Sequence, residues 1–140
     1  MILLMPLMTW NEKLAVGVKV LDDDHKKLVG MVNQLYDGIQ SGHAKESLGP
    51  TLDGLIDYTK AHFAREEKFF AQTGYAATEA HKKEHADLTR QVLDVQQKYK
   101  AGVSGTLSLE VMNFLKNWLV NHIQGSDQKY GPHLNSKGIR

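Results

Sequence analysis

A chain of 140 residues with 41% hydrophobic and 24% charged residues has the composition of one globular domain, large enough to bury a core. Seventeen basic and sixteen acidic residues leave a net charge of +1, which gives no electrostatic footprint for nucleic acid. Because the chain has no cysteine, disulfides, zinc–thiolate sites and iron–sulfur clusters are excluded.

The N-terminal residues 1–8 are apolar apart from Pro6, but they do not have the pattern of a targeting signal. They lack a basic region, a sufficiently long hydrophobic stretch and a small-residue cleavage site. They are also far shorter than the roughly 20 apolar residues that a membrane span needs. We therefore expect a cytoplasmic protein without a membrane span.

From Trp10 to Leu21, apolar residues alternate with other residues, at Leu14, Val16, Val18 and Val20. A period of two is typical of a β-strand, but no partner strand is visible in the sequence. We therefore expect residues 1–21 to form an extended arm that lies over the rest of the protein and is anchored by Trp10.

Four segments with helical periodicity follow, separated at Gly42, Gly74 and Gly102. In each, apolar residues recur at steps of three and four, which places them along one helical face. We expect helices over residues 22–41, 48–73, 78–101 and 107–125. Short connections favour antiparallel neighbours, so the sequence predicts an all-α fold, an antiparallel up-down-up-down four-helix bundle. A single domain over 1–140 would then consist of the arm, the bundle in 22–127 and a tail in 128–140.

Seven side chains that could bind a metal fall on or beside the apolar faces of these helices: His25, His62, Glu66, His81, His85, His122 and Asp127. Burying so many polar groups without compensation would cost many kcal/mol, and metal coordination is the simplest compensation. In an antiparallel bundle, the starts of the first and third helices lie level with the ends of the second and fourth. We therefore expect all seven side chains to meet at one end of the bundle.

The spacing of these residues fits one helical face, with one exception. Two pairs are four residues apart and so lie one turn apart on the same face: His62 with Glu66, and His81 with His85. Asp127 follows His122 by five residues, which on an ideal helix is about 140° away from it. The helix must therefore deform for Asp127 to join the cluster, and Gly125 is well placed to permit this.

Ligand counting predicts a two-metal centre with one open position. If both carboxylates and an oxo or hydroxo group bridge two metals, each metal has three oxygen ligands. Five histidines can then divide only as three and two, which leaves one six-coordinate and one five-coordinate ion. Imidazole and carboxylate ligands without thiolate fit iron, and also admit manganese, cobalt or zinc.

These residues resemble the signature of the hemerythrin family, specifically that of the single-domain bacteriohemerythrins. The matching ligand segments are His62-Phe-Ala-Arg-Glu66, His81-Lys-Lys-Glu-His85 and His122-Ile-Gln-Gly-Ser-Asp127. The match also includes Trp10, Val16-Gly17-Val18, Asp24-His25 and Trp118-Leu119. It extends from Met8 to just beyond Asp127, and every ligand position is occupied.

The resemblance implies an oxygen-binding protein rather than an enzyme, with two iron ions (Fe²⁺ or Fe³⁺) bridged by an oxo or hydroxo group and by Glu66 and Asp127. By position, the six-coordinate iron would be held by His81, His85 and His122. His25 and His62 would hold the five-coordinate iron, whose open position binds O₂ reversibly. Candidates for the apolar wall of the O₂ pocket are Leu28, Phe63, Trp118 and Leu119.

Other functions fit fewer of these residues. His81 to His85 also matches the inverted zinc-protease motif, with Glu84 as the base, but that leaves five candidate ligands unexplained. A carboxylate-bridged oxygenase would use Glu-x-x-His motifs, and the chain has none. Iron storage would need a cage-forming assembly. A di-iron redox enzyme that consumes peroxide or NO, and an oxygen or iron sensor with a separate partner, stay open as alternatives.

Three further polar residues are expected to face solvent. Glu67 is one residue, or about 100°, away from Glu66, and His43 and His133 lie on none of the apolar faces. We further expect a monomer that carries or stores O₂, or delivers it to an oxygen-consuming enzyme.

Overall fold

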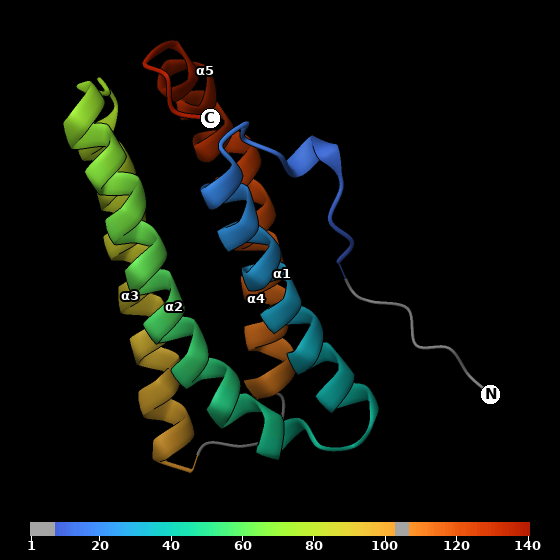
Figure 1. Ribbon diagram of the computed structural model, residues 1–140. Helices are drawn as coiled ribbons and strands as arrows, with labels where there is room; N and C mark the ends of the chain where they lie inside the picture. The colour runs from blue at the N-terminus through green and yellow to red at the C-terminus, as the bar shows by residue number, and fades with distance from the viewer. Residues whose placement is uncertain (1–7, 103–106) are drawn as a thin grey trace.

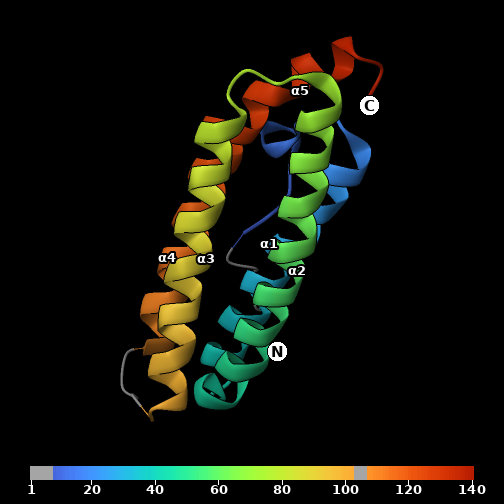
Figure 2. The same cartoon turned by 90° about the vertical axis from the view of Figure 1, so that its left-hand side faces the viewer.

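The computed structural model describes residues 8–102 and 107–140, and this part of the chain contains helices and no β-strand. Its four long helices are α1 (Lys19–Gln40), α2 (Ala44–Thr73), α3 (Thr78–Lys100) and α4 (Leu107–His122). They alternate in direction along the bundle, with α1 beside α4 and α2 beside α3 (Figures 1 and 2). The predicted all-α, up-down-up-down four-helix bundle is confirmed.

The core of the bundle is built from the steps of three and four seen in the sequence. Representative members from each helix are at most 5% exposed: Leu28, Val32, Leu52, Leu55, Leu88, Val92, Val111 and Leu115. Each such side chain contributes about 1.5–3 kcal/mol through its removal from water. This apolar stack fills the middle of the bundle and supports the polar residues at one end.

The first two helices begin earlier than expected, at Lys19 rather than residue 22 and at Ala44 rather than residue 48. Asp22 therefore lies inside α1, and its carboxylate accepts hydrogen bonds from the backbone of Val16 (2.8 Å) and Gly17 (3.3 Å). The acidic residue thus holds the preceding arm against the helix instead of marking the point where the helix begins.

The arm is only partly extended, and residues 1–7 of the predicted arm lie outside the described residues. A short 3-10 helix, η1 (Glu12–Leu14), interrupts it, and Val16 and Val18 are buried. The backbone of Met8 forms two hydrogen bonds with the Asn33 amide, of 2.9 and 2.8 Å. The arm therefore packs along α1 and over the end of the bundle where α5 lies (Figure 1).

The segment after α4 is folded rather than a loose tail. A π-helix, η2 (Ile123–Asp127), continues α4 and leads into a short helix, α5 (Gln128–Ser136). Tyr130 and Leu134 of α5 are fully buried. A Cβ atom on Gly131 would lie 2.0 Å from the backbone oxygen of Val16, so only glycine permits this contact between α5 and the arm.

None of the described helices is both long enough and apolar enough to cross a membrane.

Candidate metal centre

All seven predicted ligands lie together in the core, at the end of the bundle covered by α5. Each is between 0% and 5% exposed. They come from every long helix and from the π-helix: His25 on α1, His62 and Glu66 on α2, His81 and His85 on α3, His122 at the end of α4, and Asp127 on η2. The seven side chains therefore lie at the same level along the bundle axis, as the sequence predicts.

The π-helix explains the five-residue step from His122 to Asp127. In a π-helix the backbone bonds from residue i to i+5, so residues five apart lie near the same face. His122 Nε2 lies 3.0 Å from Asp127 Oδ1. This is the deformation that the spacing requires, and Gly125 lies within it.

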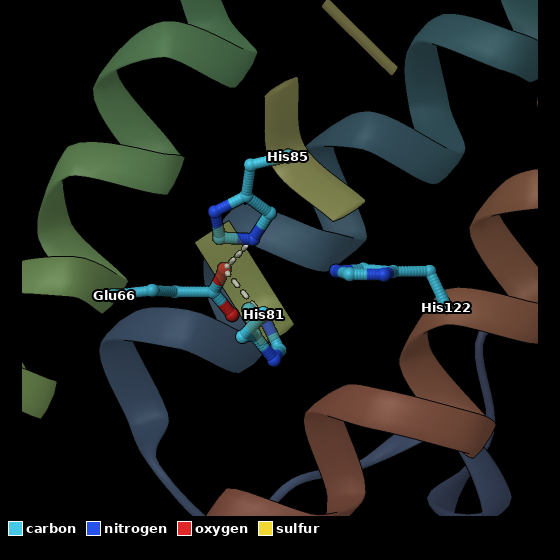
Figure 3. Close-up of side chains that lie close together, drawn as sticks. All are labelled: Glu66, His81, His85 and His122. Carbon is cyan, nitrogen blue, oxygen red and sulfur yellow. Dashed lines mark ion pairs between the residues drawn. The ribbon is translucent and has the colours of Figure 1, made fainter. Parts of the chain in front are cut away.

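One group of side chains surrounds the Glu66 carboxylate with three imidazoles, those of His81, His85 and His122. Ligand atoms from these four residues all lie within 4.8 Å of one another. Glu66 Oε1 is 3.0 Å from His85 Nε2 and 3.7 Å from His81 Nε2. Figure 3 shows Glu66 entering from α2 and the three imidazoles facing it from α3 and α4.

A second group lies beside the first and shares Glu66 with it. It consists of His25, His62, Glu66 and Asp127, again with ligand atoms within 4.8 Å. His62 Nε2 is 3.5 Å from Glu66 Oε1. Asp127 reaches both groups, because one oxygen is 2.9 Å from His25 Nε2 and the other is 2.9 Å from His81 Nε2. Both carboxylates therefore stand between three imidazoles on one side and two on the other.

The buried polar atoms of the centre lack partners within the described residues. Eight buried side-chain atoms form no hydrogen bond, and all belong to this cluster: both ring nitrogens of His25, both oxygens of Asp127, Oε1 of Glu66, and Nε2 of His81, His85 and His122. Several lie close together without hydrogen-bond alignment. A buried polar group without a partner costs about 1–3 kcal/mol, so the Nε2 atoms and carboxylate oxygens that face one another here fit metal ions as their missing partners.

The carboxylates and imidazoles of the cluster shift one another's pKa values. Burial alone favours uncharged groups, but the surrounding imidazoles hold the pKa of Asp127 well below its usual value and that of Glu66 at about 2. Despite burial, the carboxylates of Asp127 and Glu66 raise the pKa of His81 to about 9. The two anions therefore hold protons on imidazoles when no metal is present, and a metal cation would replace those protons.

Three carboxylates bind the outward-facing Nδ1 atoms of three of the imidazoles, a role that the sequence pattern predicts for none of them. Asp24 Oδ2 lies 2.8 Å from His62 Nδ1, Glu67 Oε2 lies 3.2 Å from His85 Nδ1, and Glu84 Oε1 lies 3.3 Å from His122 Nδ1. The expectation that Glu67 simply faces solvent is wrong, since its side chain is 31% exposed and contacts a ring of the centre.

Glu84, which would be the base in the alternative zinc-protease motif, pairs with Nδ1 of His122. It also accepts a hydrogen bond of 2.7 Å from the Ser126 hydroxyl. This carboxylate is held by the Ser126 hydroxyl and by Nδ1 of His122, the ring nitrogen that faces away from the centre, so the geometry gives no support to zinc proteolysis.

Tyr130 is a further contact that sequence reasoning missed. Its hydroxyl donates a hydrogen bond to Glu66 Oε2, and its side chain is fully buried. Because Tyr130 follows the last ligand in a segment expected to be a tail, no helical periodicity linked it to Glu66. The hydrogen bond leaves Oε1, the other oxygen, to face the imidazoles.

The two histidines expected to face solvent differ in their exposure. His43 is exposed in the connection between α1 and α2, as predicted. His133 is half-buried, its Nε2 lies 3.1 Å from the backbone oxygen of Thr73, and its ring packs 5.2 Å from that of Tyr75. The prediction for His133 is wrong because the tail folds as α5 and docks against the end of α2.

A small apolar cavity of about 20 Å³ lies one helical turn below the ligands. This is enough for about one water-sized molecule. Its walls come from all four long helices: Leu28, Val32, Leu55, Thr59, Leu88, Val92, Leu115, Trp118 and Leu119. The Thr59 hydroxyl donates to the backbone oxygen of Leu55 at 2.6 Å, so it is turned away from the cavity.

Of the four predicted pocket residues, Leu28, Trp118 and Leu119 line this cavity and Phe63 does not. Phe63 instead stacks on the ring of His85, with centroids 3.7 Å apart and planes at 6°. Trp118 stacks in the same way on His122, at 4.3 Å and 15°. Two aromatic rings thus fix the planes of two imidazoles, which spacing alone did not indicate.

Comparison with known proteins agrees with this geometry. Residues 16–134 match the family model of the hemerythrin HHE cation binding domain. The bacteriohemerythrin of Methylococcus capsulatus is 41% identical over 94% of this chain and 100% of its own length. That of Stenotrophomonas maltophilia is 34% identical over 94% of this chain and 86% of its own length.

Solved structures agree as well. The crystal structure of a wild-type hemerythrin superposes with a TM-score of 0.83 and 40% identity, and covers 91% of this chain and 98% of that one. A matching domain model, full-length relatives and a shared fold lead to one conclusion: the chain belongs to the hemerythrin family.

Proposed function

We propose that this protein binds O₂ reversibly at a centre of two iron ions held by the seven buried side chains. His81, His85 and His122 would hold one ion, His25 and His62 the other, and Glu66 and Asp127 would bridge them. The observation that carries this proposal is the arrangement of three imidazoles and two imidazoles around two shared carboxylates, in a cluster where eight buried side-chain atoms have no hydrogen-bond partner among the described residues.

Iron supplies the reversible electron transfer to O₂ when it is bound, and the chain supplies the rest. Five imidazoles and two carboxylates would fill all but one position of two bound ions, if an oxo or hydroxo group also bridged them. The stacked rings of Phe63 and Trp118 keep two imidazoles in place. The small apolar cavity beneath the ligands offers water no polar partner, which disfavours the entry of bulk solvent from that side.

Oxygen carriage, storage or delivery to an oxygen-consuming enzyme is the role that fits a hemerythrin-family protein. We infer a monomer that works in the cytoplasm without catalysing a reaction of its own. Peroxide or NO chemistry would need a residue to supply or accept protons beside the open position. The cavity beneath the ligands is lined by apolar side chains and by Thr59, whose hydroxyl donates to the backbone oxygen of Leu55, so no proton donor faces the centre from that cavity within the described residues.

The test measures whether the absorption of the iron-loaded protein changes reversibly with O₂. Protein loaded anaerobically with Fe²⁺ should be nearly colourless, gain charge-transfer absorption when exposed to air, and lose it again under vacuum or argon. Repeated cycles at constant amplitude would support reversible binding. Absorption that argon cannot remove, together with peroxide in solution, would contradict the proposal and favour a redox enzyme.

A further inference from the structure

Asp24 is a buried carboxylate that is not among the proposed ligands yet contacts one of them. It lies on α1 immediately before His25 and is 4% exposed. Its Oδ2 atom is 2.8 Å from Nδ1 of His62, across the interface with α2. The Asp24 side chain therefore contacts an imidazole of the neighbouring helix, not that of His25, the next residue in the sequence.

Two more donors hold the same carboxylate. The hydroxyl of Tyr58 donates a hydrogen bond of 2.7 Å to Asp24 Oδ1, and Nε of Arg65 lies 3.5 Å from Oδ2. Tyr58 is half-buried, and Lys27 lies over its ring with Nζ 4.6 Å from the centroid. The carboxylate is thus fixed from three directions, and its orientation toward His62 is set by the packing of α1 on α2.

This contact determines which nitrogen of His62 can face the metal centre. An ionised carboxylate only accepts hydrogen bonds, so Nδ1 must carry the proton. The lone pair is then left on Nε2, which points toward Glu66 Oε1 at 3.5 Å. A hydrogen bond to a carboxylate also makes a metal-binding imidazole a stronger electron donor.

The two other carboxylates that bind imidazoles are less well protected from water. The side chain of Asp24 is 6% exposed, whereas those of Glu67 and Glu84 are 31% and 43% exposed. Because water screens a charge, the buried carboxylate acts more strongly on its imidazole. The strongest such contact therefore belongs to the group with two imidazoles, the side on which the proposed function places the open position.

We propose that Asp24, restrained by Tyr58 and Arg65, is a positioning residue that sets the affinity and the reduction potential of the metal held by His25 and His62. This inference rests on the proposed function. Because Tyr58 and Arg65 also interact with the Asp24 carboxylate, they weaken its hydrogen bond to His62 and so lower the donor strength of that imidazole. Removing Asp24 and removing the Tyr58 hydroxyl should therefore change the donor strength of His62 in opposite directions.

The experiment compares Asp24→Asn and Tyr58→Phe with the wild type. Fe²⁺ and Zn²⁺ titrations would measure the two binding constants, and spectroelectrochemistry the reduction potential of the iron-loaded protein. For Asp24→Asn we expect the weaker of the two metal-binding constants to fall by about 10–100-fold, with a raised potential. For Tyr58→Phe we expect both ions to be retained and the potential to fall.

Asp23→Asn is the matched control, because Asp23 precedes Asp24 on the same helix but is exposed, and among the described residues its one ion pair is with Lys19, at 2.8 Å. It should leave affinity and potential unchanged. ¹⁵N NMR of the zinc-loaded wild type should place the His62 proton on Nδ1.

Shifts of opposite sign support the inference, because loss of packing alone would move both variants the same way. Shifts of the same sign, or no shift in Tyr58→Phe, would overturn it. If Asp24→Asn does not fold, the sign of the shift in Tyr58→Phe decides alone. Failure of the wild type to bind two ions would instead refute the proposed function.

Discussion

Glu66→Gln is expected to abolish the binding of two iron ions. Glu66 belongs to both groups of ligand atoms, and its side chain is fully buried. A neutral amide is a weaker ligand and cannot balance two cations, so the loss should exceed the roughly 100-fold in metal affinity that an outer contact can cost. Iron content after anaerobic loading and gel filtration, together with absorption in air, would measure it.

Glu67→Gln is the matched control for this prediction. It makes the same substitution at the next position, where the side chain pairs with the outward-facing Nδ1 of His85 and belongs to neither group of ligand atoms. We expect this variant to keep both ions and its colour, with affinity lowered by about tenfold at most. Two ions bound at wild-type affinity by Glu66→Gln would show that Glu66 does not join the two metals.

Leu119→Ala is expected to lower the free energy of unfolding by about 2–5 kcal/mol and to speed autoxidation. Leu119 is 4% exposed and lines the apolar cavity. Its truncation enlarges a space that borders the imidazoles one turn away, so water entering there gains polar partners. Denaturant unfolding would measure the loss of stability, and the decay of the oxygenated absorption would measure autoxidation.

Leu109→Ala provides the control on the same helix, since Leu109 is 46% exposed. Its effect on stability should stay within about 0.5 kcal/mol, and its autoxidation rate should equal that of the wild type. A Leu119→Ala protein that is destabilised but autoxidises at the wild-type rate would remove Leu119 from the wall that keeps water out.

The bundle was predictable because its periodicity is continuous. The apolar steps of three and four in each segment specify both a helix and its buried face, and the short connections leave little choice of topology. The ends of helices were less predictable. Asp22, the first residue of the first expected helix, lies inside α1 and accepts hydrogen bonds from the backbone of Val16 and Gly17, a contact that depends on where the arm lies.

The grouping of the seven side chains in one place was also predictable, since their spacing places them on buried faces at one depth. Even the five-residue step to Asp127 carried its own signal, because only a deformed helix could satisfy it. Residues in contact with the ligands gave no such signal. Asp24 reaches His62 across 38 positions in the chain, and Tyr130 reaches Glu66 across 64.

Those contacts depend on how helices pack rather than on the pattern within any one helix. Glu67 illustrates the point: a rotation of about 100° from Glu66 predicts an outward side chain, but α3 lies on that side and brings His85 within 3.2 Å. Periodicity identifies which residues face inward, whereas the partners of residues at the boundary follow from the neighbouring helix.

Anomalous diffraction from crystals of the iron-loaded protein, measured on both sides of the iron absorption edge, tests the central claim most directly. We expect two iron peaks per chain, one beside His81, His85 and His122 and the other beside His25 and His62, with Glu66 and Asp127 reaching both. A single peak, or peaks away from these side chains, would contradict a di-iron centre in this protein.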